Sequence, residues 1–112
     1  MLRENILEII KKWNESSLTE FDVHSFAEDL VEHLEVCEDK ESSDTIASEV
    51  LFQLDIMNHQ LITKDDIPAI EEFLKTHRGE EVRGWDSWKN YWETIDFDKR
   101  KIELKNNPFY SV

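Results

Sequence analysis

Three residues that could bind a metal ion fall on one helical line in the first half of the chain. Asp29, His33 and Cys37 are each four residues apart, so they would share one face of a helix. A zinc site needs three or four converging ligands, as a rule from more than one element. The sequence has no CxxC, HExxH or EF-hand pattern to supply the others. We therefore predict no metal site and no cofactor, and interpret Asp29 and His33 as residues of a solvated face.

A catalytic nucleophile is equally hard to assemble from this sequence. Cys37 is the only cysteine and has His33 one turn away, but the neighbouring carboxylates disfavour a thiolate. No GxSxG motif surrounds a serine, and the two glycines are too few for a phosphate-binding loop. We predict that the protein is not an enzyme and has no catalytic residues. An enzyme that uses Cys37 or a carboxylate remains an alternative.

The strongest feature of the sequence is a run of negative charge. Between Glu15 and Glu49 there are twelve acidic residues and one basic residue, Lys40, within a chain of net charge −13. Such charge repels phosphate backbones and anionic membrane surfaces, so it argues against direct nucleic-acid or membrane binding. The simpler interpretation is a solvated face that keeps the protein in solution. However, concentrated like charge destabilises a small domain, which favours a surface that binds a basic partner protein.

Candidate contacts to this partner lie on the expected second helix, on the loop after it, and in a later aromatic cluster. The acidic candidates are Glu28, Asp29, Glu32, Glu35, Glu38, Asp39 and Glu41. In the cluster, Trp88 and Trp92 have the spacing of core residues. Trp85 and Tyr91 point elsewhere on a helical wheel, so we expect them to be exposed and to anchor an interface.

The elements that position these residues are predicted to be helices. A chain of 112 residues that is 39% hydrophobic suits one domain, 1–112, and two Gly and two Pro are too few for a turn-rich β fold. Apolar residues at three- and four-residue spacing predict helices over roughly 1–15, 20–36, 43–59, 65–78 and 85–104. We expect an all-α, compact bundle of four to five helices. The alternative is an irregular or strand-like C-terminal tail, with a short strand from Arg100 to Leu104.

Local signals define several expected helix ends. Thr19 or Asp22 can cap the second helix, and Asp66 can cap the fourth, with Pro68 in its first turn. Gly79 is expected to end the fourth helix in a left-handed conformation, and Gly84 to begin a separate region. A single cysteine, no signal peptide and no long apolar run predict a soluble cytoplasmic protein.

A small acidic helical bundle with aromatic residues near carboxylates resembles the immunity proteins of bacterial toxin–immunity pairs, of the bacteriocin or contact-dependent inhibition type. The Thr19-Glu20-Phe21 onset and the stretch from Ile67 to Trp85 are similar to the colicin-type DNase immunity proteins. The resemblance implies a cytosolic bacterial protein that binds a basic nuclease domain and covers its nucleic-acid surface. It rests on size, charge and expected fold, and it transfers no functional residue to this chain.

The sequence therefore favours a non-enzymatic inhibitor, an immunity protein that neutralises a basic toxin domain, with a nuclease as the expected target. An acidic regulatory adaptor or nucleic-acid mimic that binds a basic host protein is the alternative, because it would use the same surface. A generic helical domain of a larger assembly is a further possibility, with the basic stretch from Lys99 to Lys105 contacting another acidic chain or the protein's own acidic face.

Overall fold

A computed structural model describes residues 2–36 and 45–110, and every regular element in these ranges is helical. The described elements are α1 (Leu2–Asn14), α2 (Glu20–Val36), α3 (Thr45–Asp55), α4 (Met57–Gln60), the 3-10 helix η2 (Lys64–Asp66), α5 (Ile67–Leu74), α6 (Glu81–Glu93) and α7 (Phe97–Glu103). The all-α class is thus confirmed, and the expected count of four to five helices is too low. The strand-like alternative for the tail is wrong for 100–103, which belong to α7.

The additional helices arise because two expected long helices are interrupted. Continuous helix ends at Asp55, and Leu61 takes a left-handed conformation with φ of 55°. The last expected helix ends at Glu93 and restarts at Phe97, where the Asp96 side chain accepts a hydrogen bond from the Lys99 amide at 3.0 Å. This cap gives α7 a start of its own, so helix does not run unbroken from 85 to 104.

Start signals near Thr19 act as the sequence indicated. The Asp22 carboxylate accepts a hydrogen bond from the Thr19 amide at 2.9 Å, and the Asp22 amide donates to the Thr19 hydroxyl at 3.3 Å. This reciprocal pair is a capping box, which satisfies amides that the first turn of a helix leaves free. It begins α2 at Glu20, as expected.

The start of α5 differs from the sequence expectation. Pro68 lies in the first turn, but Asp66 makes no capping bond to α5. Its carboxylate instead accepts from the Thr63 amide at 2.9 Å, within a capping box that begins η2. Helix α5 ends at Leu74, and Gly79, with φ of +92°, lies in the turn before α6.

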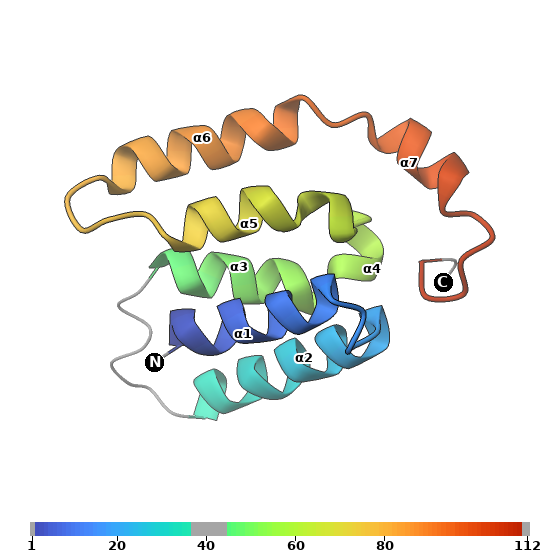
Figure 1. The fold of residues 1–112 in the computed structure, drawn as a ribbon, viewed down its shortest axis with the longest axis horizontal. Coiled ribbons are helices and arrows are strands. Elements are labelled where there is room, and N and C mark those ends of the chain that lie inside the picture. Colours follow the sequence, from blue (N-terminus) through green and yellow to red (C-terminus); the bar gives the residue numbers. More distant parts are fainter. Residues whose placement is uncertain (1, 37–44, 111–112) are drawn as a thin grey trace.

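The helices are stacked in layers (Figure 1). Helix α3 contacts α1, α2 and α5, and α5 in turn contacts α6. In Figure 1, α1 and α2 lie along the lower edge and α6 along the upper edge, with α3 and α5 between them. Helices α2 and α6 therefore form opposite sides of the protein.

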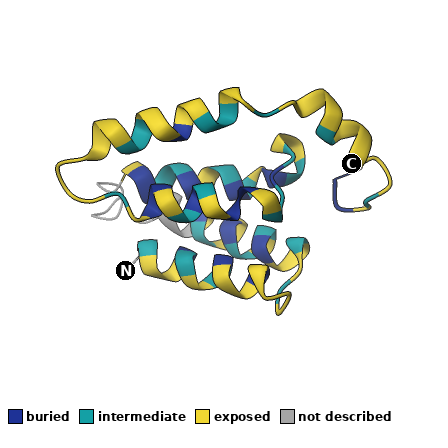
Figure 2. Cartoon of the chain, turned by 45° about the horizontal axis from the view of Figure 1, so that its top comes forward, coloured by how far each residue is buried: buried dark blue, intermediate teal, exposed yellow. Residues whose placement is uncertain are grey.

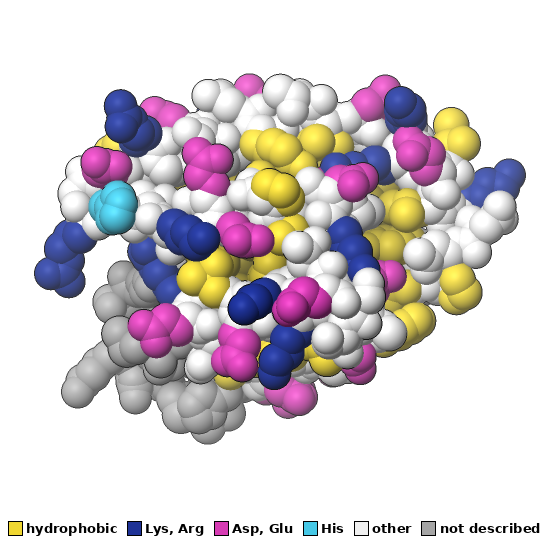
Figure 3. Space-filling view, viewed as in Figure 1, with side chains coloured by type: hydrophobic (Ala, Val, Ile, Leu, Met, Phe, Trp, Pro, Cys, Tyr) yellow, Lys and Arg dark blue, Asp and Glu magenta, His cyan; other side chains and the backbone are white. Residues whose placement is uncertain are grey.

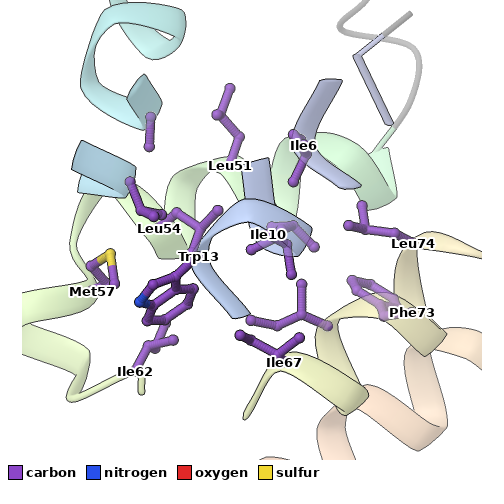
Figure 4. Packing of buried hydrophobic residues seen from close by; sticks show 14 of the residues in the cluster. Ile6, Ile10, Trp13, Leu51, Leu54, Met57, Ile62, Ile67, Phe73 and Leu74 are labelled. Atoms are coloured by element: carbon purple, nitrogen blue, oxygen red, sulfur yellow. The ribbon is translucent and has the colours of Figure 1, made fainter. Parts of the chain in front are cut away.

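The core lies between α1, α3 and α5 (Figure 4). Ile6, Ile10 and Trp13 of α1 are fully buried, in line with their expected helical stripe. They meet buried residues from the other helices and from the segment between α4 and η2, which include Leu51, Leu54, Met57, Ile62, Ile67, Phe73 and Leu74. The indole nitrogen of Trp13 donates to Glu20 at 2.7 Å, so this buried ring keeps a polar partner at the start of α2.

The last two helices, α6 and α7, bury fewer of their residues against this core (Figure 2). Most residues of α6 and α7 are exposed, and Trp88 is the buried residue of α6. The Trp88 ring stacks on Phe73 of α5 at 4.4 Å, and Trp85 meets the same Phe73 edge-on at 5.0 Å. Aromatic contacts with α5 thus hold α6 in place.

The C-terminal tail docks on the bundle. Phe109 is 5% exposed and meets the rings of Phe21 and His24 on α2. The Tyr110 hydroxyl donates to the carbonyl of Ile62, and burial, with the charge of Glu20, raises the pKa of this phenol. Among the described residues, no helix combines the length and the apolar character needed to cross a membrane.

Candidate functional site

The most buried charged group of the described chain is the carboxylate of Asp66. Arg100 of α7 donates two hydrogen bonds to it, at 2.6 and 2.8 Å, so the guanidinium binds both carboxylate oxygens. The hydroxyl of Tyr91 on α6 donates to the same carboxylate, as does the Thr63 amide. These bonds join η2, α6 and α7, so the network stabilises the upper half of the fold.

The network also changes the acidity of its members. Burial raises the pKa of Tyr91 to about 12, and the hydrogen bond and negative charge of Asp66 act in the same direction. For Arg100, burial acts to lower the pKa, but the hydrogen bond and charge of Asp66 outweigh it and raise the pKa. At neutral pH the guanidinium of Arg100 is therefore charged and the phenol of Tyr91 is neutral.

Several acids of the charged segment have roles within the fold. Glu20 accepts from the Trp13 indole, Asp22 caps α2, and Glu49 accepts from the Trp88 indole at 3.0 Å. These three carboxylates stabilise helices that the core requires. They are therefore poor candidates for binding a partner.

The remaining described candidates form an exposed group on α2. Glu28, Asp29 and Glu32 are all exposed, and no Lys or Arg among the described residues lies within ion-pair distance of them. Helix α2 itself contains no Lys or Arg. We name Glu28, Asp29 and Glu32 the α2 acidic face. Of the other predicted contacts, Glu38, Asp39 and Glu41 lie outside the described residues, and the side chain of Glu35 is not described.

The face that Figure 3 shows carries charges of both signs. Acidic and basic side chains are mixed there, and hydrophobic side chains are visible between α5 and α6. Two i, i+4 ion pairs, Glu8–Lys12 and Glu71–Lys75, relieve the charge on α1 and α5. Helix α2 differs from α1 and α5 in that it contains no Lys or Arg that could form such a pair.

The predicted aromatic anchors lie on the other side of the protein from the α2 acidic face. Trp85 and Tyr91 are partly buried: Trp85 packs on Phe73, and the Tyr91 hydroxyl binds Asp66. They also line different hollows beside α6, of about 510 and 620 Å³. The expectation that both residues stand exposed is wrong, because α6 turns them toward α5 and α7.

The basic C-terminal stretch does not neutralise the α2 acidic face within the described structure. Its Arg100 pairs with Asp66, which lies outside the acidic segment. The tail reaches the start of α2 through Phe109, which contacts the rings of Phe21 and His24. The tail therefore contacts α2 through aromatic rings rather than through ion pairs in the described structure.

A cluster that the sequence analysis did not predict lies next to the α2 acidic face. Ligand atoms of His24, Glu28 and Asp55 lie within 4.8 Å of one another. The spacing of His24 and Glu28 places both on one face of α2, but Asp55 comes from α3 and only the fold brings it close. The line first considered for a metal, Asp29, His33 and Cys37, ends at a residue outside the described ranges.

Comparison with protein-family models, with curated proteins and with solved structures finds no match for this chain.

Proposed function

We propose that the protein is a non-enzymatic inhibitor. It would be a cytoplasmic immunity protein that binds and neutralises a basic bacterial toxin domain, and a nuclease is the target that we propose. The observation that carries this proposal is the α2 acidic face. Its three carboxylates are exposed and lack a basic partner among the described residues. Adjacent like charges without partners destabilise a helix, and a basic protein docked on them would remove this repulsion.

The acids of the charged segment fall into two groups, those that accept hydrogen bonds within the fold and those that do not, and this difference supports the proposal. Glu20, Asp22 and Glu49 each accept a hydrogen bond that the fold uses. Glu28, Asp29 and Glu32 accept none from the described residues, so the fold does not require their charge. A role outside the chain accounts for them, and binding a cationic surface is the role that their chemistry fits.

The mechanism of inhibition would be electrostatic capture followed by occlusion. A nuclease binds phosphates with a surface rich in Lys and Arg. Carboxylates on one exposed helix can meet such a surface, raise the association rate and block access of the nucleic acid. Glu35 near the end of α2, and Glu38, Asp39 and Glu41 after it in the sequence, are the remaining acidic contacts that we propose. Trp85 and Tyr91 lie on the opposite side, so a single interface of this kind excludes them.

Capture from extract of the source cells tests the proposal. The immobilised protein is compared with a triple variant, Glu28→Lys, Asp29→Lys and Glu32→Lys. A control triple variant makes the same change in charge elsewhere, at Glu72→Lys, Glu80→Lys and Glu103→Lys, which are all exposed. We expect the wild type and the control to retain a basic protein that the first variant loses.

The retained protein is then assayed for toxicity and for nuclease activity, with and without an equimolar amount of the inhibitor. Loss of both activities on binding is the expected result. Equal capture by the two triple variants would contradict the assignment of the α2 acidic face. A basic partner that keeps full activity when bound would contradict inhibition and favour the adaptor alternative.

A further inference from the structure

A polar hollow lies where the middle of α2 passes the junction of α3 and α4. It has a volume of about 450 Å³, and His24, Glu28, Asp55 and Asn58 are among the residues that line it. Two helices that are packed against each other supply the three potential ligands. This convergence from separate elements distinguishes the cluster from a run of acids along one helix.

We propose that His24, Glu28 and Asp55 bind one divalent transition-metal ion of the zinc type. The three ligand atoms lie within 4.8 Å of one another, whereas ligands at about 2.1 Å from a tetrahedral zinc are about 3.4 Å apart. Small rotamer changes of Glu28, which is exposed, and of Asp55 can close this difference. One imidazole and two carboxylates form a three-ligand set that leaves a coordination position open for water or substrate.

The three groups are free to take this role. Within residues 2–36 and 45–110, none of the three side chains makes a hydrogen bond or an ion pair. The Oδ1 atom of Asn58, another residue lining the hollow, is buried and lacks a hydrogen-bond partner. A buried carbonyl oxygen without a partner costs free energy, and a hydrated metal ion would supply one through a bound water.

Two further features favour a cation at this position. Asp55 is the last residue of α3, and the C-terminus of a helix carries partial negative charge. The His24 ring meets Phe109 at 5.8 Å with an interplanar angle of 72°, so packing against the docked tail limits the rotation of this imidazole. The imidazole also sets the chemical class, since a purely carboxylate site would suit magnesium or calcium instead.

Isothermal titration of the intact protein with zinc chloride near neutral pH tests this site. Magnesium chloride serves as the hard-cation comparison. The variants are His24→Ala and Asp55→Asn, where the second keeps the shape of the side chain. The matched controls are His77→Ala and Glu72→Gln, which change an exposed histidine and an exposed acid away from the hollow. Glu28 is left unchanged because it also belongs to the α2 acidic face.

We expect one zinc ion per chain, no binding of magnesium at the same concentrations, and an apparent Kd that rises at least tenfold in both site variants. The ring protons of His24 should shift in NMR spectra on zinc addition, while those of His77 should not. Failure of the wild type to bind zinc, or equal affinity in the site and control variants, would overturn the proposal. Binding of magnesium as tight as that of zinc would overturn the assigned metal class.

Discussion

At the scale of single residues, the fold depends strongly on one buried carboxylate. Asp66 is fully buried, and four donated hydrogen bonds from Arg100, Tyr91 and Thr63 reach its two oxygens. A buried charge is tolerated only when it is paired and its remaining lone pairs are satisfied. Removing one partner therefore costs more than the contact itself contributes, because the other charge stays behind unpaired.

Replacement of the cationic partner gives the first prediction. Arg100→Met leaves the Asp66 carboxylate buried without its guanidinium, and we expect the free energy of unfolding to fall by about 3 kcal/mol. Lys101→Met, which removes an exposed positive charge from the same helix, should change it by less than about 0.5 kcal/mol. Urea denaturation followed by circular dichroism measures both. A loss for Arg100→Met no larger than that of the control would contradict this role of the ion pair.

The pKa of Tyr91 gives a second prediction, on alkaline stability. The phenol has a pKa of about 12 in the folded protein, against 10.0 for an ordinary tyrosine. Between these values the unfolded chain releases the proton while the folded chain keeps it, so stability falls as pH rises from about 10 toward 12. The contribution is fully present below pH 10.

Urea midpoints measured from about pH 9 to about pH 11 test this dependence. Tyr91→Phe should show a shallower loss of stability with pH than the wild type, because it has no proton to release at this position. Tyr110→Phe should also reduce the slope, since burial raises the pKa of Tyr110 too. Identical slopes for the wild type and both variants would show that neither phenol is linked to folding.

At the scale of elements, Gly84 shows why one helix start could not be predicted. The sequence suggested that this glycine begins a new region, yet it lies inside α6. A Cβ added at Gly84 would lie 2.5 Å from the Thr76 hydroxyl oxygen and 2.7 Å from its methyl group. The residue is therefore glycine because α6 passes close to the segment after α5, and only the folded chain reveals this approach.

The close approach gives a third prediction, in the form of a double-mutant cycle. Gly84→Ala should reduce the free energy of unfolding by about 1–3 kcal/mol, because the new methyl group meets Thr76. In the background of Thr76→Ala, the same change should cost clearly less, since only the Cβ of residue 76, at 3.1 Å, still meets the new methyl group and alanine favours helix. Thermal or urea unfolding of the four proteins measures the coupling. Equal effects in the two backgrounds would contradict the steric explanation.

Other element boundaries differ in how much the sequence reveals of them. The start of α2 could be predicted because Thr19 and Asp22 act locally, through their own backbone neighbours. The interruption after Asp55 carries no proline or glycine, and the chain turns there while residues on both sides, Leu54 and Met57, are buried. Tertiary packing rather than local preference sets this boundary. A prediction from hydrophobic periodicity alone therefore continued the helix past Asp55 to about residue 59.

At the scale of the whole molecule, the same distinction applies to the candidate sites. Exposure of Glu28, Asp29 and Glu32 follows from helical periodicity, so the sequence was sufficient to propose the α2 acidic face. The ion pair of Asp66 with Arg100, and the proximity of His24 and Glu28 to Asp55, bring together residues that are 27 or more positions apart. Such convergence depends on how the layers stack, and no spacing rule along the chain contains it.

The stacking of the helices also separates the acidic and the aromatic candidate contacts, which the sequence analysis assigned to one interface. The α2 acidic face lies on one side of the bundle and the aromatic cluster of α6 on the other (Figure 1). A partner that contacts only the α2 side of the bundle would not reach Trp85 or Tyr91. The charge of α2 must then do most of the steering, and the effect should depend on ionic strength.

This dependence is the fourth prediction, for the basic partner of the proposed function. Raising the ionic strength from about 0.01 M to about 1 M shortens the screening length from about 30 Å to about 3 Å. The association rate constant should fall at least tenfold over this range, while the dissociation rate changes little. Stopped-flow measurements should show that the triple lysine variant of the α2 acidic face loses this salt dependence, whereas the control with Lys at 72, 80 and 103 keeps most of it. If both variants slow association equally, net charge rather than its position on α2 guides the encounter, and the α2 acidic face has no special role in it.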